Sequence, residues 1–446
     1  ITVIGCGYVG LVTAIGLAET GHLVTGVDRD RIKINKLRRY EVPFYEKGLE
    51  PLIRRHLQSG RLSFTTNPGI GMASAQIIFI AVGTPPAADG SVDLGQVKAV
   101  AAEIGHELRG YTVIVIKSTV PVGATRQIQT IISRHTRQRV PFDVVSNPEF
   151  LREGNALYDF MNPDRIVIGA EAPKALQIME ELYRPFLERK VPLIRTSPET
   201  AELIKYASNA FLATKISFIN EMAELCEAVG ADLPTVAQGM GLDHRIGPEF
   251  LAAGPGYGGS CFPKDTKALI QIARSHGKEV TIVEATDLVN RRTKKRMLEK
   301  IIRAIDPPAG KTVALLGLAF KANTDDLRES PALPLIEGLL AAGARIRVHD
   351  PKALSAAEAI FGSKIKYFED EYAAAEGAEA LVLVTEWEQY RNLNLPLLKE
   401  KMAQAMIIDL RNLLTPENVH AHGFLYEGIG RGQQRTGEKN GQLSTL

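Results

Sequence analysis

The chain contains little cysteine, because Cys6, Cys226 and Cys261 are the only three among its 446 residues. They lie far apart, are odd in number and lack the close pairing of metal ligands, so we expect neither a disulfide framework nor a metal site. Free thiols are typical of a reducing compartment, and we therefore expect the protein to be cytoplasmic.

A long apolar run and a strong charge of one sign are also absent. No stretch of 18 or more apolar residues occurs, which predicts no membrane span, and no signal peptide precedes the first predicted strand. Because the chain opens without methionine, we expect a few residues to be missing at its start. The formal net charge of +2 argues against nucleic-acid binding driven by bulk electrostatics.

The first motif is Gly5-Cys6-Gly7-Tyr8-Val9-Gly10, a glycine pattern that follows a predicted strand, Thr2–Ile4, and opens an apolar helix. A second predicted strand, Leu23–Val27, ends at Asp28, 18 residues after the last glycine. In dinucleotide-binding folds such glycines allow a tight turn and a close approach of the pyrophosphate, while the acid binds the ribose 2′-hydroxyl. An isolated pattern could be a mere turn, but strand, helix, strand and acid together predict a site for NAD rather than NADP.

Polar residues follow three further predicted strands, at the edge where ligands bind in a doubly wound sheet. The strands are Ile77–Val82, Val113–Ile116 and Phe142–Val145. Thr84 and Thr119 follow the first two, although either threonine could simply cap a turn or a helix. Asn147–Gly154 follows the third strand and places Glu149 and Glu153 four residues apart, where they could share one helical face or be merely solvated.

A long helix is predicted from Pro198 to Val229, with Ser197 as its N-cap. Its apolar residues form two seams, which predicts burial on more than one side, as in a central helix that also forms a subunit interface. The seams consist of Ile204, Ala207, Phe211, Phe218, Met222, Leu225 and Val229, and of Ala210, Ala213, Ile216 and Ala223. Lys205 and Asn209 interrupt this pattern as a polar pair on one face, and spacing alone equally allows a solvated helix end.

The stretch Gly254–Asp265 joins a glycine run to a cysteine and two charged residues. Cys261 directly precedes a predicted helix, Pro263–Ser275, whose N-terminal dipole would lower the pKa of the thiol together with the Lys264 ammonium. This context predicts a thiolate nucleophile. The alternatives are that Cys261 is a small buried apolar residue and that Asp265 only complements the helix dipole.

A second unit of alternating strands and helices follows a boundary at residues 306–310. Its predicted elements are the helix Val283–Ile305 before the boundary, the strand Thr312–Leu316, the helix Pro334–Ala342 and the strands Ile346–Val348, Ala380–Val384 and Met406–Ile408. We therefore predict an α/β protein with two Rossmann-like doubly wound domains, joined by a long central helix and a small helical dimerisation domain. The expected boundaries are 1–196 for the NAD-binding domain, 197–306 for the central helical domain with the dimer interface and the catalytic loop, 307–430 for the C-terminal Rossmann-like domain, and 431–446 for a flexible tail.

Taken together, these motifs closely resemble the UDP-glucose/GDP-mannose dehydrogenase family, over nearly the whole chain to about residue 425. The resemblance rests on Gly5–Gly10, Lys117–Gly123, Asn147–Gly154, Lys205 with Asn209, Gly256–Asp265 and Phe320–Pro331. It implies a four-electron oxidation in which the primary 6-hydroxyl of UDP-glucose becomes the carboxylate of UDP-glucuronate, with two NAD⁺ used in succession.

By the same resemblance, Cys261 is the nucleophile that captures the aldehyde as a thiohemiacetal. A second hydride transfer then gives a thioester, which water hydrolyses. Lys205 would stabilise developing oxyanions with the help of Asn209, and Asp265 would handle protons or activate water. Glu149 and Thr119 would contribute to the water network. Which of Asp265, Glu149 and Thr119 acts as the general base stays open.

The resemblance also implies the binding residues. Those expected to contact NAD are Gly5, Gly7, Tyr8, Val9, Gly10, Asp28, Lys33, Thr84, Thr119, Glu153, Lys264 and Arg328. Those expected to contact the nucleotide sugar are Glu149, Phe150, Leu151, Arg152, Lys205, Asn209, Phe250, Leu251, Ala252, Ala253, Gly254, Gly258 and Lys321. Arg245 would complete the sugar site from across a homodimer.

Two alternatives remain at this point. A sister dehydrogenase would act on GDP-mannose or a UDP-N-acetylhexosamine, although Tyr257, Phe262 and Asn155–Arg165 resemble the UDP-glucose branch. A catalytically silent nucleotide-sugar sensor would keep both Rossmann folds. The joint presence of Cys261, Lys205 and Asp265 argues against a sensor, because binding alone requires none of that chemistry.

Overall fold

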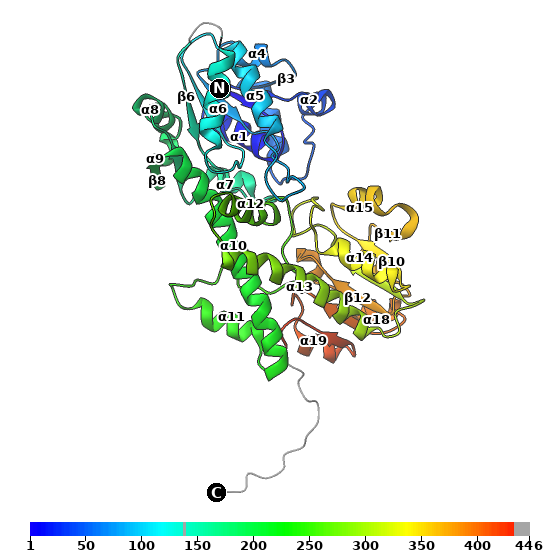
Figure 1. Ribbon diagram of the computed structural model, residues 1–446. Helices are drawn as coiled ribbons and strands as arrows, with labels where there is room; N and C mark the ends of the chain where they lie inside the picture. Colours follow the sequence, from blue (N-terminus) through cyan, green and yellow to red (C-terminus); the bar gives the residue numbers. More distant parts are fainter. Residues whose placement is uncertain (137–139, 432–446) are drawn as a thin grey trace. The chain divides into compact units, whose positions relative to one another are not determined.

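The computed structural model describes residues 1–136 and 140–431 (Figure 1). The chain folds into two compact units, of which unit 1 comprises Ile1–Ala210, Lys264–Val280 and Asn323–Asp325, and unit 2 comprises Phe211–Pro263, Thr281–Ala322 and the chain from Asp326 onward. The tail predicted for 431–446 lies outside the described residues, apart from Arg431. The three expected domain boundaries stay predictions.

Unit 1 contains an eight-stranded sheet with the strand order β3-β2-β1-β4-β5-β6-β7-β8. Its strands are β1 (Thr2–Ile4), β2 (Val24–Val27), β3 (Leu62–Thr65), β4 (Ile77–Ile80), β5 (Thr112–Ile116), β6 (Phe142–Ser146), β7 (Ile166–Gly169) and β8 (Leu193–Thr196). The pairs are parallel except for β6 with β7. The first six strands have the order 3-2-1-4-5-6 of a doubly wound nucleotide-binding sheet, whose switch point lies between β1 and β4.

Helices cover this sheet and bury one apolar core with it. They are α1 (Tyr8–Glu19), α2 (Arg31–Arg38), α3 (Leu49–Gln58), α4 (Pro68–Met72), α5 (Gly95–Glu107), α6 (Ala124–His135), α7 (Ala156–Met161), α8 (Pro173–Leu182) and α9 (Arg184–Leu187). Helices α5 and α6 pack side by side (Figure 1), and α1 packs against α3 and α7. Strands β1, β4, β5 and β7 are buried on both faces, which is why they read as continuous apolar runs in the sequence.

Unit 2 contains a six-stranded, all-parallel sheet with the order β11-β10-β9-β12-β13-β14, which again is 3-2-1-4-5-6. Its strands are β9 (Thr312–Leu316), β10 (Arg345–His349), β11 (Lys366–Tyr367), β12 (Ala380–Leu383), β13 (Met406–Asp409) and β14 (Leu425–Glu427). Its helices are α11 (Leu233–Gly241), α13 (Thr281–Ala304), α14 (Ala332–Ala341), α15 (Leu354–Phe361), the 3₁₀ helix η1 (Gly362–Lys364), α16 (Glu371–Ala375), α17 (Glu388–Arg391), α18 (Leu395–Lys401) and α19 (Pro416–Ala421). The fold class predicted from the sequence is therefore confirmed in its two Rossmann-like sheets and its helical central region.

Two helices run from one unit into the other along the chain. They are α10 (Pro198–Val229) and α12 (Phe262–Ser275), and both match the ranges predicted from the sequence to within one residue. The second apolar seam of α10 is buried at Ala210, Ala213 and Ala223. The first seam is not buried in the single chain, since Phe211 and Val229 are 67% and 66% exposed. Within the described residues, no helix has both the length and the hydropathy that crossing a bilayer requires.

Candidate active site

The glycine motif of unit 1 forms a turn that lies against the backbone of a neighbouring strand. A Cβ on Gly5 would lie 2.5 Å from the Ala81 carbonyl oxygen, and one on Gly10 would lie 1.8 Å from the Gly5 oxygen. Gly5 also has φ of +97°, which favours glycine. Gly7 precedes α1, whose N-terminus has no side-chain cap, and a Cβ there would meet no atom within 4 Å. These residues therefore fit the pyrophosphate of NAD, which needs open backbone N–H groups at a helix N-terminus.

Asp28 lies at the carboxyl end of β2, as predicted for the acid that binds the ribose. Its carboxylate accepts hydrogen bonds from the Cys6 backbone at 2.9 Å, from the Asp30 backbone at 3.0 Å and from the Lys33 ammonium at 2.7 Å. Burial raises the pKa of Asp28, but these hydrogen bonds outweigh it and leave the pKa below its ordinary value. The group is thus an anionic acceptor at neutral pH, which suits a ribose hydroxyl and opposes a 2′-phosphate.

Lys205 of α10 and Glu149 form an ion pair in the interior of unit 1. The ammonium nitrogen lies 3.0 Å from a carboxylate oxygen, and each side chain is only 4% exposed. The Phe150 ring lies beneath the same ammonium, 5.4 Å from nitrogen to ring centroid. The alternative of a solvated helix end is therefore wrong for Lys205. A buried ammonium held in this way can stabilise negative charge that develops beside it.

A second buried lysine, Lys117, lies near this pair, and the sequence reasoning did not single it out as functional. It follows β5 and donates a hydrogen bond of 3.1 Å to Asn147. Burial lowers the pKa of Lys117 to about 8, with Glu149 opposing the shift and Lys205 adding to it. Its signal in the sequence was a lysine placed directly after an apolar strand.

We expect Lys117 to make the stability of unit 1 depend on pH. Between its folded pKa of about 8 and the ordinary value of 10.5, the unfolded chain binds the extra proton, so stability rises with pH. The slope reaches on the order of 1 kcal/mol per pH unit. Urea unfolding between pH 7.5 and 10 should show this rise in the wild type and a flatter profile in Lys117→Met, whereas equal slopes would contradict the assignment.

Asn209 and Asp265 link α10 to the first turn of α12. The Asn209 amide donates a 2.6 Å hydrogen bond to the Asp265 carboxylate, and the Lys264 ammonium pairs with its other oxygen. Asp265 is 1% exposed. Lys205 and Asn209 are both buried, each beside its own carboxylate, so the alternative of a solvated helix end is wrong for both.

Cys261 is the last residue before α12, as the sequence predicted, and its sulfur is in no disulfide bond. Its Sγ lies 3.5 Å from the Ser260 hydroxyl. Cys6 and Cys226 differ, because both are buried and burial raises the pKa of each thiol. Cys261 is half-buried, so the alternative of a fully buried core cysteine is wrong for it.

The glycines before Cys261 are required by the local packing of unit 2. Gly256 and Gly259 have φ of +106° and +82°, and a Cβ on Gly258 would lie 2.4 Å from the Glu329 carbonyl oxygen. The Asn290 side-chain oxygen accepts a 2.8 Å hydrogen bond from the Tyr257 N–H, and the Asn290 amide nitrogen donates a 3.1 Å hydrogen bond to the Tyr257 carbonyl. These two hydrogen bonds hold the loop backbone at Tyr257.

The segment Phe250–Gly254 contains a strained residue and lies beside Arg411, which the sequence did not predict. Phe250 has φ of +65°, which is costly outside glycine and tends to occur at functional sites. The Arg411 guanidinium, at the carboxyl end of β13, lies 2.8 Å from the position of a Cβ on Gly254. It also donates to the Val384 and Phe320 carbonyls. The sequence reasoning missed Arg411, since nothing local distinguishes it from a surface arginine.

Glu46 is a further residue that the sequence reasoning missed. It is 6% exposed and accepts hydrogen bonds from the Gly154 and Ala156 backbone N–H groups at 2.7 and 2.8 Å. It thereby caps α7 from a distant loop. The Gly154 N–H also donates to the Tyr8 hydroxyl, so the end of the Glu149–Gly154 segment is tied to the glycine motif.

The remaining predicted residues are distributed over both units. In unit 1, Thr84 and Thr119 are half-buried in the loops after β4 and β5, Glu153 is half-buried before α7, and Arg152 pairs with Asp159. In unit 2, Arg328 pairs with Asp326, Arg245 pairs with Asp243, and Lys321 lies 5.6 Å from the Phe320 ring centroid. The predicted contacts of these side chains with cofactor or sugar stay predictions.

Comparisons with known proteins match nearly the whole chain. Three models of the UDP-glucose/GDP-mannose dehydrogenase family match: the NAD binding domain at residues 1–187, the central domain at 199–292 and the UDP binding domain at 314–416. The UDP-glucose 6-dehydrogenase of Bacillus subtilis is 48% identical over 431 residues, 97% of this chain and 93% of its own.

Two solved structures have the same fold as this chain. A UDP-glucose dehydrogenase from Pyrobaculum islandicum has a TM-score of 0.89 and 41% identity, with 97% of both chains covered. A UDP-D-ManNAc dehydrogenase from Pyrococcus horikoshii has a TM-score of 0.85 and 27% identity, covering 97% of this chain and 100% of that one.

Proposed function

The chain belongs to the UDP-glucose/GDP-mannose dehydrogenase family, and from this premise we propose that it oxidises UDP-glucose to UDP-glucuronate through a Cys261-bound intermediate. It is an NAD-dependent dehydrogenase, as the match to the NAD binding domain and the relatives indicate. The observation that carries the proposal is the buried polar cluster of α10 and α12. Lys205 and Asn209 of α10 lie beside Glu149 and Asp265, and Asp265 belongs to α12, which begins directly after Cys261.

The proposed reaction starts at the 6-hydroxyl of the sugar. NAD⁺, when bound, accepts one hydride from C6 in each of two successive oxidations. In the first oxidation the hydroxyl also loses its proton to a base, with Asp265, Glu149 and Thr119 as the candidates, and an aldehyde results. The Cys261 thiolate then adds to the aldehyde carbon, and the new alkoxide takes a proton to give a thiohemiacetal.

The second oxidation removes the remaining hydride and the hydroxyl proton of the thiohemiacetal, which leaves a thioester. A water molecule adds to the thioester carbon, the C–S bond breaks, and the carboxylate leaves with Cys261 restored. Negative charge develops on the C6 oxygen in the oxidations and in hydrolysis. The Lys205 ammonium and the Asn209 amide are proposed to stabilise that charge.

We propose a homodimer built on α10. Its first apolar seam presents Phe211, Phe218, Leu225 and Val229 to solvent, with exposures of 67%, 42%, 53% and 66%. Large exposed apolar patches mark interaction sites, and a second copy of the chain would cover this one. Arg245, exposed beyond α11, would then reach the partner's sugar site. A molecular mass equal to that of a single chain, measured by light scattering, would contradict the homodimer.

We propose the NAD and sugar contacts implied by the resemblance, and a reducing cytoplasm as the compartment. The fit of Gly5, Gly7 and Gly10 to a pyrophosphate supports the first. The second is supported by Cys6, Cys226 and Cys261, which form no disulfide bond.

The experiment that tests the function is NADH formation from a panel of nucleotide sugars. UDP-glucose should have the highest kcat/KM, well above GDP-mannose, UDP-N-acetylmannosamine and UDP-N-acetylglucosamine. A preference for GDP-mannose or an acetylated sugar would assign the chain to a sister activity instead. Sugar binding with no NADH from any member would establish a silent sensor and contradict the proposal.

A further inference from the structure

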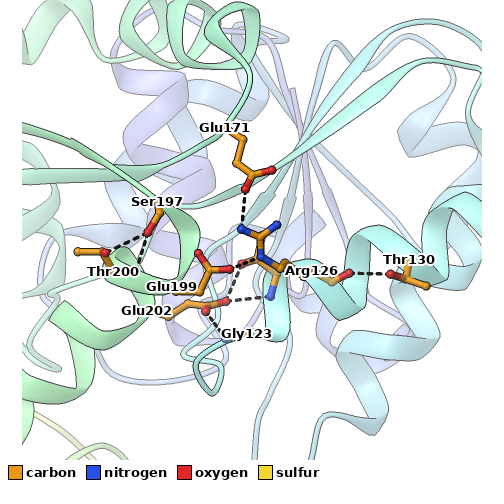
Figure 2. Close-up of polar contacts among 9 residues, drawn as sticks. Gly123, Arg126, Thr130, Glu171, Ser197, Glu199, Thr200 and Glu202 are labelled. Atoms are coloured by element: carbon orange, nitrogen blue, oxygen red, sulfur yellow. Dashed lines mark hydrogen bonds and ion pairs between the residues drawn. The ribbon is translucent and has the colours of Figure 1, made fainter.

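Glu202 of α10 is a buried carboxylate that none of the proposed steps uses. It is 3% exposed, and its hydrogen-bond donors among the described residues come from the start of α6. The Gly123 N–H donates at 2.6 Å, the Thr125 N–H at 2.8 Å and the Thr125 hydroxyl at 2.6 Å. Figure 2 shows Glu202 facing Gly123 across the gap between the two helices. Burial raises the pKa of Glu202, and the hydrogen bonds from Thr125 and Gly123 oppose that shift.

The contact replaces a cap that α6 lacks. The N-cap residue of α6 is Gly123, which has φ of +88° and no side chain that could cap the helix. A carboxylate at this end satisfies N–H groups that would otherwise be unpaired and complements the helix dipole. Because the cap comes from 77 residues along the chain, it joins two elements rather than stabilising one.

Both joined elements carry residues of the proposed reaction. On α10, Lys205 follows Glu202 by three residues, so the two lie about one helical turn apart. Before α6, the loop that ends at Gly123 contains Thr119. We infer that Glu202 is a positioning residue, which fixes the Thr119 loop relative to Lys205 so that proton transfer and charge stabilisation act on the same carbon atom.

The neighbouring ion pairs do not replace this contact. Arg126 of α6 pairs with Glu199 of α10 and with Glu171, as Figure 2 shows, but the Arg126 side chain is 55% exposed. Exposed pairs between long side chains fix geometry weakly, because solvent screens them and the side chains stay mobile. Glu202 is therefore the short, water-excluded connection in this cluster.

This inference rests on the proposed function, and its test compares Glu202→Ala and Glu202→Gln with the wild type. Misplacing a reacting group by about 1 Å costs up to 100-fold in rate, so kcat of Glu202→Ala should fall about 10- to 100-fold, with KM for NAD near its wild-type value. Glu202→Gln keeps an acceptor oxygen and should retain more activity than Glu202→Ala. The primary isotope effect of UDP-glucose deuterated at C6 should rise in Glu202→Ala, since hydride transfer becomes rate-limiting.

A matched control separates positioning from stability. Asp232 caps α11 by accepting from the Thr235 N–H at 3.1 Å and the Thr235 hydroxyl at 2.7 Å, the same donor types that Thr125 offers Glu202. Asp232→Asn should change the melting temperature but not the isotope effect. If both Glu202 variants keep the wild-type isotope effect and lose only folded protein, the inference is wrong. A wild type that forms no NADH from any sugar would instead contradict the proposed function.

Discussion

Cys261→Ser is expected to abolish the complete oxidation while leaving NAD binding intact. A serine hydroxyl stays protonated near neutral pH, so it cannot capture an aldehyde as a thiolate does, and we expect kcat to fall on the order of 10³-fold or more. Fold and cofactor site should survive, because Cys261 is half-buried, lies outside the glycine motif and changes by a single atom. Steady-state NADH formation and NAD titration measure the two effects separately.

The control for this substitution is Cys226→Ala. Cys226 is 4% exposed within α10, and burial raises the pKa of its thiol, so it is protonated and packed at neutral pH. Its removal should cost some stability and leave kcat unchanged. Unchanged turnover in Cys261→Ser, or an equal loss in Cys226→Ala, would remove Cys261 from the role of nucleophile.

Lys205→Met is expected to slow every step in which the C6 oxygen becomes negative. Removing one preorganised donor to an oxyanion costs about 10²–10³ in kcat, and a methionine keeps most of the apolar stem of the lysine. The substitution also leaves the Glu149 carboxylate buried without the ammonium at 3.0 Å. Breaking a buried pair on one side costs roughly 3–5 kcal/mol, so the variant should also unfold at lower urea.

The double variant Lys205→Met with Glu149→Gln distinguishes these two effects. Neutralising Glu149 removes the unpaired buried charge, so stability should recover, while kcat should stay well below that of Glu149→Gln alone, because Glu149 is itself a candidate base. If activity recovers together with stability, Lys205 serves the fold rather than the chemistry. Urea unfolding and initial rates, measured on the same preparations, decide between them.

The sequence predicted those parts of the site whose signals are local. The apolar pattern predicted the strand Thr2–Ile4 with the bounds that the structure has. The N-cap and the apolar seams predicted the helix from Pro198 to Val229. The position of Cys261 before a helix followed from Pro263 and the apolar spacing behind it. The first seam of α10 was predicted to be buried, as in a helix that also forms a subunit interface, and it is exposed in the single chain, so the interface stays a prediction.

The residues that the sequence did not reveal act over long separations. Glu46 caps α7 from 110 residues away, and Glu202 caps α6 from 77 residues away. Neither shows a short-range pattern, since a capping carboxylate normally lies next to the helix that it caps. Arg411 lies beside Gly254 only because the carboxyl end of β13 is brought there by the fold of unit 2. Such partners depend on tertiary packing, which local spacing does not encode.

The central claim is that Cys261 retains the half-oxidised sugar between two hydride transfers, and the yield of NADH per sugar tests it most directly. With limiting UDP-glucose and excess NAD⁺, the reaction should run to two NADH per sugar, with UDP-glucuronate as the product and no free aldehyde. A yield of one NADH with an aldehyde released to a carbonyl trap would contradict the claim.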